Sequence, residues 1–128
     1  MSELVVVDRS EVRPGKVAEL KAAIKELARF VEAKEPRPLA YNVYLDEAGT
    51  GMTVLQIHPD SASMESHLEV AGSVFARFAE LIKLSRMDVY GQPSEKLLDQ
   101  LRGKIQLLGD ATMVVHDFEA GFTRFGSS

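Results

Sequence analysis

Residues 39–57, LAYNVYLDEAGTGMTVLQI, decide the fold class of this chain of 128 residues. Two runs rich in β-branched, aromatic and other apolar residues, 39–45 and 52–57, flank a segment rich in Gly and Asp. Such a pattern predicts two antiparallel strands joined by a turn. Successive side chains of a strand point to opposite faces of a sheet, and neither alternate set here is consistently polar. Both faces of the predicted sheet therefore need a cover.

The segments around this hairpin complete an ordered series of strands and helices. Apolar residues spaced three and four apart predict helices, β-branched runs predict strands, and Pro and Gly mark where elements end. The predicted elements are strand 4–7, helix 16–34, strand 39–45, strand 52–57, helix 61–71 capped by Asp60 or Ser61, a second helical segment from Ser73 whose apolar stripe includes Leu81 and Ile82, and strand 87–90. This order predicts a ferredoxin-like βαββαβ fold of the α+β class.

The C-terminal part adds a helix and a strand to this core. Ser94 is a favourable N-cap, and the apolar stripe that follows it predicts a third helix. Residues 111–118 predict a fifth strand, which the tail 121–125 is able to extend. Pairing of this strand within its own chain and pairing with a second copy both stay open.

We therefore expect a single domain over residues 1–128. Its core spans residues 4–91, and the helix–strand extension spans residues 93–125.

The apolar character of both sheet faces bears on the oligomeric state. In a ferredoxin-like arrangement both crossover helices lie on one face, and an antiparallel sheet with one free face alternates apolar and polar residues. The strands of this chain do not alternate in that way. A second copy that covers the free face through a two-fold contact explains the pattern, and we favour this homodimer. The alternative is a monomer whose third helix folds over that face.

Composition excludes several classes of partner and chemistry. The formal net charge is −4, with Lys and Arg interleaved with Asp and Glu, so no basic patch for nucleic acid is present. The absence of cysteine excludes disulfides, thiolate catalysis and iron–sulfur clusters and fits a reducing compartment. No run approaches the roughly 20 apolar residues of a membrane span, and the N-terminal residues lack a signal-peptide pattern. We expect a cytoplasmic protein that binds neither nucleic acid nor membrane.

Three segments carry a resemblance to a known family. They are residues 12–16 (VRPGK), residues 58–68 (HPDSASMESHL) and residues 89–91 (VYG). The first resembles the strand-to-helix junction, the second the central signature and the third the last core strand of the antibiotic-biosynthesis-monooxygenase-like (ABM) family of dimeric α+β barrels. Together these three segments extend the resemblance over residues 4–91.

The resemblance implies an activity as well as a fold. The family includes cofactor-free oxygenases of quinol-like and polyketide aromatics, haem-degrading enzymes and proteins without known activity. It therefore implies a monooxygenase that needs no cofactor and acts on a small electron-rich aromatic compound. His67 matches the family's helix histidine, whereas His58 stands where the family commonly has Trp, and no residue matches the haem ligand. The alternatives are a non-catalytic protein that binds a small apolar ligand and a structural dimer without ligand.

Three histidines are the first candidates for chemistry. His67 is the candidate catalytic base, because a neutral imidazole in an apolar pocket accepts a phenol proton; the alternative is a partly buried histidine bonded to a backbone carbonyl. His58 either orients a ligand oxygen at the pocket mouth or is a surface residue of a turn. His116 is interpreted as an exposed strand residue. Metal sites need three or four converging ligands, and the spacing of these histidines predicts no metal.

Five further residues are candidates for ligand binding. Tyr41, Asn42 and Tyr44 either bind ligand oxygens or form a dimer interface or sheet edge. Phe75 and Phe78, at helical spacing, either line the pocket or belong to the core.

Overall fold

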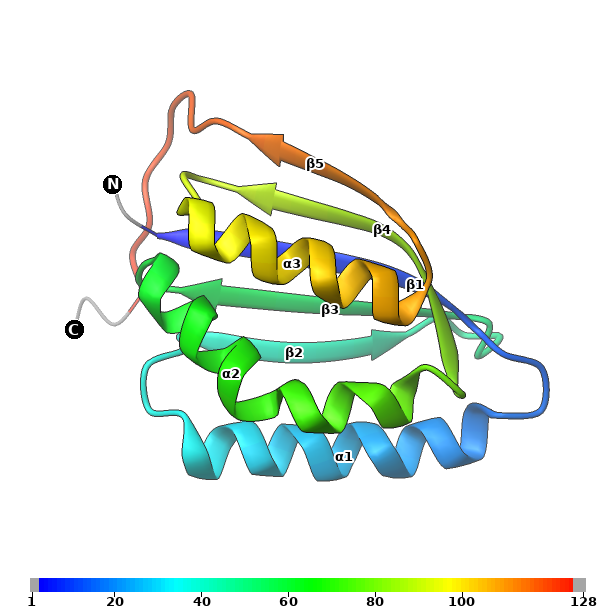
Figure 1. The fold of residues 1–128 in the computed structure, drawn as a ribbon. Coiled ribbons are helices and arrows are strands. Elements are labelled where there is room, and N and C mark those ends of the chain that lie inside the picture. Colours follow the sequence, from blue (N-terminus) through cyan, green and yellow to red (C-terminus); the bar gives the residue numbers. More distant parts are fainter. Residues whose placement is uncertain (1–2, 126–128) are drawn as a thin grey trace.

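The computed structural model describes residues 3–125 (Figure 1). Its elements in chain order are β1 (Leu4–Val12), α1 (Val17–Lys34), β2 (Ala40–Leu45), β3 (Gly51–His58), α2 (Ser61–Phe78), β4 (Ile82–Tyr90), α3 (Glu95–Leu108) and β5 (Thr112–His116).

β1 is the central strand of one five-stranded sheet with the order β2-β3-β1-β4-β5. β1 pairs antiparallel with both β3 and β4, and β2 pairs antiparallel with β3. β5 runs parallel to β4, and α3 supplies the crossover that parallel neighbours require. The ferredoxin-like βαββαβ fold with an added helix and strand is thereby confirmed, and β5 pairs within its own chain.

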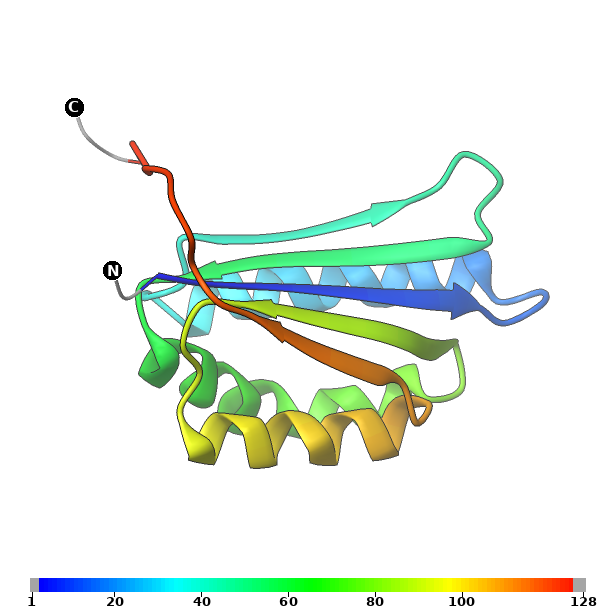
Figure 2. The ribbon, with the colours of Figure 1, turned by 90° about the horizontal axis from the view of Figure 1, so that it is seen from above.

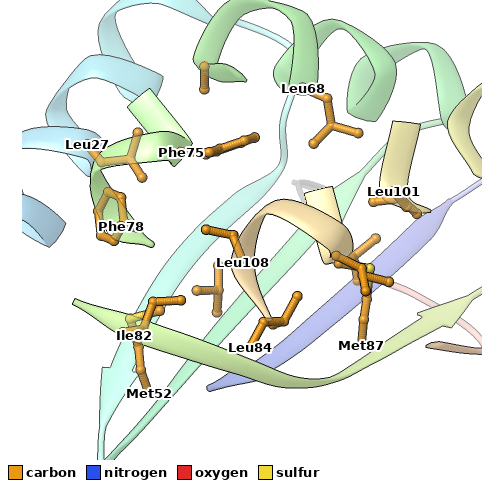
Figure 3. Packing of buried hydrophobic residues seen from close by; sticks show 14 of the residues in the cluster. Leu27, Met52, Leu68, Phe75, Phe78, Ile82, Leu84, Met87, Leu101 and Leu108 are labelled. Carbon is orange, nitrogen blue, oxygen red and sulfur yellow. The ribbon is translucent and has the colours of Figure 1, made fainter. Parts of the chain in front are cut away.

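All three helices cover the same face of the sheet (Figures 1 and 2). α2 lies between α1 and α3, and the buried side of α3 (Leu97, Leu101, Ile105 and Leu108) joins the same core as the inward residues of β1. The alternative in which the third helix covers the opposite face is therefore wrong. The core lies between the sheet and the three helices (Figure 3).

The opposite face of the sheet is covered by no helix or strand within residues 3–125, and the tail after β5 reaches only its end near Val5 and Tyr90. At its centre Val5 lies opposite Ile57, and Val7 opposite Leu55. All four side chains are half-buried, and Tyr44 on the neighbouring strand is exposed. We refer to this side of the sheet as the open face.

α2 is one continuous helix where the pattern predicted two segments. Gly72 and Ser73 lie inside it, and Figure 1 shows that the helix is bent along its length. A glycine within a helix costs only about 1 kcal/mol, and burial of Ala71 and Phe75 on either side of it offsets that cost.

The predicted lengths of several other elements were wrong. The sequence pattern predicts Leu81 and Ile82 in a helix, but α2 ends at Phe78 and β4 begins at Ile82. The prediction is wrong because a short apolar run fits a helix or a strand equally well. β1 continues beyond Val7, since its second half is paired on both sides. β5 is shorter than predicted, and the tail 121–125 contains no strand.

Two predicted N-caps agree with the structure. The Asp60 side chain accepts a hydrogen bond from the Ser63 N–H, and the Ser94 side chain accepts one from the Leu97 N–H. The expected N-caps of α2 and α3 are therefore confirmed. None of the helices within residues 3–125 has the length and apolar character needed to cross a membrane.

Asp88 is the centre of a charge cluster on the open face. Its buried carboxylate accepts two hydrogen bonds from Arg86, at 2.8 and 2.9 Å, one from His116 at 2.9 Å and one from Arg9 at 3.3 Å. The hydrogen bonds from Arg86 and His116 lower the pKa of Asp88 from 3.8 to about 2. His116 is thus a partly exposed strand residue, as expected, but with a specific carboxylate partner.

The Asp88 cluster predicts an acid-dependent contribution to stability. Because the folded pKa lies below the unfolded value, this contribution is present above pH 3.8 and is lost as the pH falls through about 2. We expect Asp88→Asn to reduce the free energy of unfolding by about 1 kcal/mol at neutral pH and by almost nothing near pH 2, measured by thermal denaturation. Asp99→Asn, which removes an exposed pair with Arg102, is the matched control and should change little. An equal loss for Asp88→Asn at both pH values would contradict the assignment.

Candidate functional site

A cavity lies between the helix-covered face of the sheet and the helices. Its apolar walls include Leu27, Phe75, Phe78 and Leu108 from the helices and Met52 and Leu84 from the sheet, all shown in Figure 3. Its polar lining consists of Asp8, Ser10, Tyr41 and Lys104. The cavity volume is about 40 Å³, so the cavity is small but large enough for ordered water.

His67 on α2 is completely buried, and it is not itself among the residues that line this cavity. Its Nδ1 lies 3.0 Å from each carboxylate oxygen of Glu35. Glu35 directly follows α1 and is itself buried; Pro36 prevents the helix from continuing past it. The predicted backbone carbonyl partner of His67 is thus replaced by a carboxyl group 32 residues away in the chain.

Burial controls the protonation of this pair. Desolvation, with smaller effects of Lys104 and His58, lowers the pKa of His67 from 6.5 to about 3. Desolvation raises the pKa of Glu35 from 4.5 to about 7. At neutral pH the imidazole is therefore neutral, and the position of its single N–H depends on whether Glu35 is ionised.

The two ring nitrogens of His67 differ in their surroundings. Nε2 is buried and has no hydrogen-bond partner among residues 3–125. The His67 ring centroid lies 5.3 Å from that of Tyr41 and 5.8 Å from that of Phe75, and both of these residues line the cavity. The ring that carries this unpartnered nitrogen thus packs against two side chains that line a small, largely apolar space.

A second polar pair lies in the cavity wall. Lys104 Nζ on α3 is 3.0 Å from Asp8 Oδ2 on β1, and both side chains are buried, at 8% and 4% exposure. The same ammonium group lies 4.6 Å from the centroid of the Phe75 ring. A buried charge is tolerated only when it is paired, so Asp8 and Lys104 depend on each other.

His58 is not available to a ligand in this arrangement. It is fully buried, with Nδ1 2.7 Å from Ser63 Oγ and Nε2 3.0 Å from Gln56 Oε1. Burial lowers its pKa from 6.5 to about 4. The interpretation of His58 as a surface residue is therefore wrong, because β3 directs it into the core and both of its ring nitrogens are occupied.

The candidate ligand-binding residues fall on two sides of the sheet. Tyr41 lines the cavity together with Phe75 and Phe78. Asn42 and Tyr44 belong to the opposite set of β2 and are exposed. The structure therefore separates Asn42 and Tyr44 from the cavity that Tyr41 faces.

Three residues of the site are not among those predicted from the sequence. Asp8 follows Leu4 and Val6 on the same face of an apolar strand, and a charge at such a position is a detectable signal of a buried partner. The sequence around Glu35 and Lys104 gives no such signal, because each residue borders the apolar stripe of a predicted helix, where charged residues are common. Among residues 3–125 no three His, Asp or Glu side chains are arranged to hold a metal ion.

Comparison with known proteins relates the chain to others by its fold. No family model matches it, and no curated protein matches it in sequence. MupZ from Pseudomonas fluorescens superposes with a TM-score of 0.70 at 20% identity, over 98% of this chain and 97% of MupZ. SnoaB, a cofactor-independent oxygenase from Streptomyces nogalater, superposes with a TM-score of 0.61 at 15% identity, over 73% of this chain and 96% of SnoaB.

A candidate antibiotic biosynthesis monooxygenase from Caulobacter crescentus CB15 also has this fold. Its TM-score is 0.59 at 21% identity, over 69% of this chain and 85% of that protein. The fold that the resemblance implied is therefore confirmed. The match with MupZ covers nearly the whole chain, whereas the match with SnoaB leaves part of the chain uncovered.

The burial of His67 predicts that its imidazole stays neutral from pH 7 down to about pH 4. Its folded pKa of about 3 lies below the ordinary 6.5, so between these values the unfolded chain binds more protons and His67 lowers stability as the pH falls. NMR of the ring nitrogens across this range measures the protonation directly. Protonation of His67 with a midpoint near pH 6.5 would show that the ring is solvated rather than buried.

Proposed function

We propose that this protein is a cofactor-independent oxygenase of a small electron-rich phenol, such as a quinol, with His67 as the base. One observation carries the proposal: His67 Nδ1 is held by Glu35, while its buried Nε2 has no partner among residues 3–125. The shared fold supports the reaction class, because SnoaB is a cofactor-independent oxygenase.

Glu35 sets whether His67 is able to act as a base. When Glu35 is protonated, its O–H donates to Nδ1 and the imidazole proton sits on Nε2. When Glu35 is ionised, Nδ1–H donates to the carboxylate and Nε2 carries a lone pair. The pKa of Glu35, about 7, means that the second form dominates above neutrality. A phenol then donates its proton to Nε2, and the carboxylate stabilises the imidazolium, as the aspartate does in a Ser-His-Asp triad.

The remaining chemistry needs only the substrate and oxygen. The phenolate transfers one electron to O₂, and the resulting radicals combine to form a C–O bond at a ring carbon that carries hydrogen. Loss of that hydrogen and cleavage of the O–O bond give a quinone and one water. One oxygen atom of O₂ becomes the new carbonyl, and the other leaves as water with the phenolic proton and the ring hydrogen.

The size of the cavity favours a second candidate, a structural dimer without ligand. A cavity of about 40 Å³ is small for an aromatic ring, so a phenol has to displace wall side chains such as Phe75 or Leu108. In a purely structural protein, Glu35 would only satisfy one nitrogen of a core histidine. Oxygen consumption and ligand binding separate the two candidates.

Removal of the base should abolish oxygen consumption. We expect the wild-type protein to consume O₂ with a reduced aromatic quinol and His67→Ala to be slower by about 10²- to 10⁴-fold, the usual contribution of a general base, measured with an oxygen electrode. His116→Asn, which changes a histidine on the open face, is the control and should keep the wild-type rate. If the wild-type protein shows neither oxygen uptake nor a rise in melting temperature with phenols, the structural candidate replaces the oxygenase.

We also propose that a second copy of the chain covers the open face. The apolar residues Val5, Val7, Leu55 and Ile57 are only half-buried in one chain, and hydrophobic area of this kind is stabilised by a partner. A sheet pairs with an identical sheet through a two-fold contact. The proposed oxygenase is therefore a homodimer, with one cavity on the helix side of each sheet.

A charge in the middle of the open face should dissociate this dimer. We expect the wild-type protein to sediment at twice 14.1 kDa and Leu55→Glu to weaken the dimer by about 100-fold, as for a central interface residue. Leu107→Glu places the same change on an exposed leucine of α3 (48% exposed), on the helix side, and should leave the mass unchanged. A wild-type particle of 14.1 kDa at micromolar concentration would refute the homodimer.

A further inference from the structure

The Asp8–Lys104 pair places a carboxylate and an ammonium group in the wall of the cavity. Oδ2 of Asp8 is bonded to Lys104 Nζ at 3.0 Å, but Oδ1 is buried with no partner among residues 3–125. Both residues line the cavity. An ammonium group has three donors, and the contact with Asp8 uses one of them. The wall therefore contains a buried carboxylate oxygen without a donor, next to a cation.

Stability alone is a poor explanation for this pair. Burying two charges costs more solvation than their attraction usually returns, and apolar residues of similar size are often as stabilising or more so. An unpartnered carboxylate oxygen adds a further cost. A ligand that supplies the missing donor removes that cost.

We propose that Asp8 and Lys104 form a recognition pair for two neighbouring oxygen atoms of the ligand. Lys104 donates to an anionic or carbonyl oxygen, and Asp8 Oδ1 accepts a hydrogen bond from a hydroxyl group on the adjacent atom. The preferred ligands are thus catechol-like or hydroxy-ketone compounds rather than simple phenols. This inference rests on the proposed function in that it assigns the substrate class of the same cavity.

The position of Lys104 relative to His67 gives the pair a part in the reaction. Lys104 is near enough to contribute to the lowered pKa of His67, and Phe75 contacts both side chains. A hydroxyl that loses its proton to His67 therefore leaves its negative charge within reach of the ammonium group. Lys104 binds the anion that the base creates, which is a form of electrostatic stabilisation, and Asp8 positions Lys104.

Two chromophoric probes test the wild-type protein directly. 4-Nitrocatechol has two neighbouring oxygens on the ring and 4-nitrophenol has one, and both change colour when they ionise. In anaerobic absorbance titrations at mildly acidic pH, we expect 4-nitrocatechol to bind at least roughly tenfold more tightly, the effect of one charge-assisted hydrogen bond. We also expect its bound form to absorb as the anion. Equal affinity for the two probes, or binding of neither, would overturn the proposal.

A double variant separates recognition from folding. Asp8→Leu with Lys104→Met replaces the ion pair by apolar groups, and we expect an unchanged or higher melting temperature with loss of both the probe preference and the anion spectrum. Lys96→Met, which removes an exposed lysine of the same helix (60% exposed), is the control and should bind as the wild type does. A folded double variant that keeps the preference would overturn the proposal, and the wild-type comparison decides it if the double variant does not fold.

These measurements are independent of turnover. A preference for 4-nitrocatechol without any oxygen consumption would support the recognition pair and refute the oxygenase. Oxygen consumption without a preference for 4-nitrocatechol would support the oxygenase and refute the recognition pair.

Discussion

The alternation of side chains along β1 dictates which residues enter the core. β1 is paired on both edges, so β3 and β4 fix its register. Leu4 and Val6 point into the core, and the strand period of two then directs Asp8 to the same side. The fold thus commits a carboxylate to the interior, where it requires a cation. Lys104 provides that cation from α3, and the cavity forms where the two meet.

The electrostatics of the cavity follow from two acid–base pairs in a region of low dielectric. Glu35 and His67 together carry no net charge while Glu35 is protonated, and Asp8 and Lys104 neutralise each other. Tyr41 lies between them: burial, Asp8 and Glu35 all raise its pKa, so it remains a neutral hydrogen-bond donor. Polar groups that are fixed before a ligand binds need little reorganisation during a reaction. Even a small cavity lined by such groups is therefore suited to stabilise charge on a ligand.

The helix and strand beyond the βαββαβ unit change both the core and the site. α3 packs beside α2 on the covered face and contributes four buried apolar residues. β5 adds a parallel edge to an otherwise antiparallel sheet. The same helix brings Lys104 to Asp8. MupZ matches 98% of this chain, whereas SnoaB matches 73% of it.

The order of the strands and helices, the N-caps at Asp60 and Ser94, and the apolar character of both sheet faces follow from the sequence, because they depend on local periodicity and local hydrogen bonds. The sequence also identified His67 as a candidate base. Only the tertiary structure joined His67 to Glu35, 32 residues away, and Asp8 to Lys104, 96 residues away. The physical reason is that the free energy of a buried charge depends on its partner, and packing of distant elements decides which partner lies within reach.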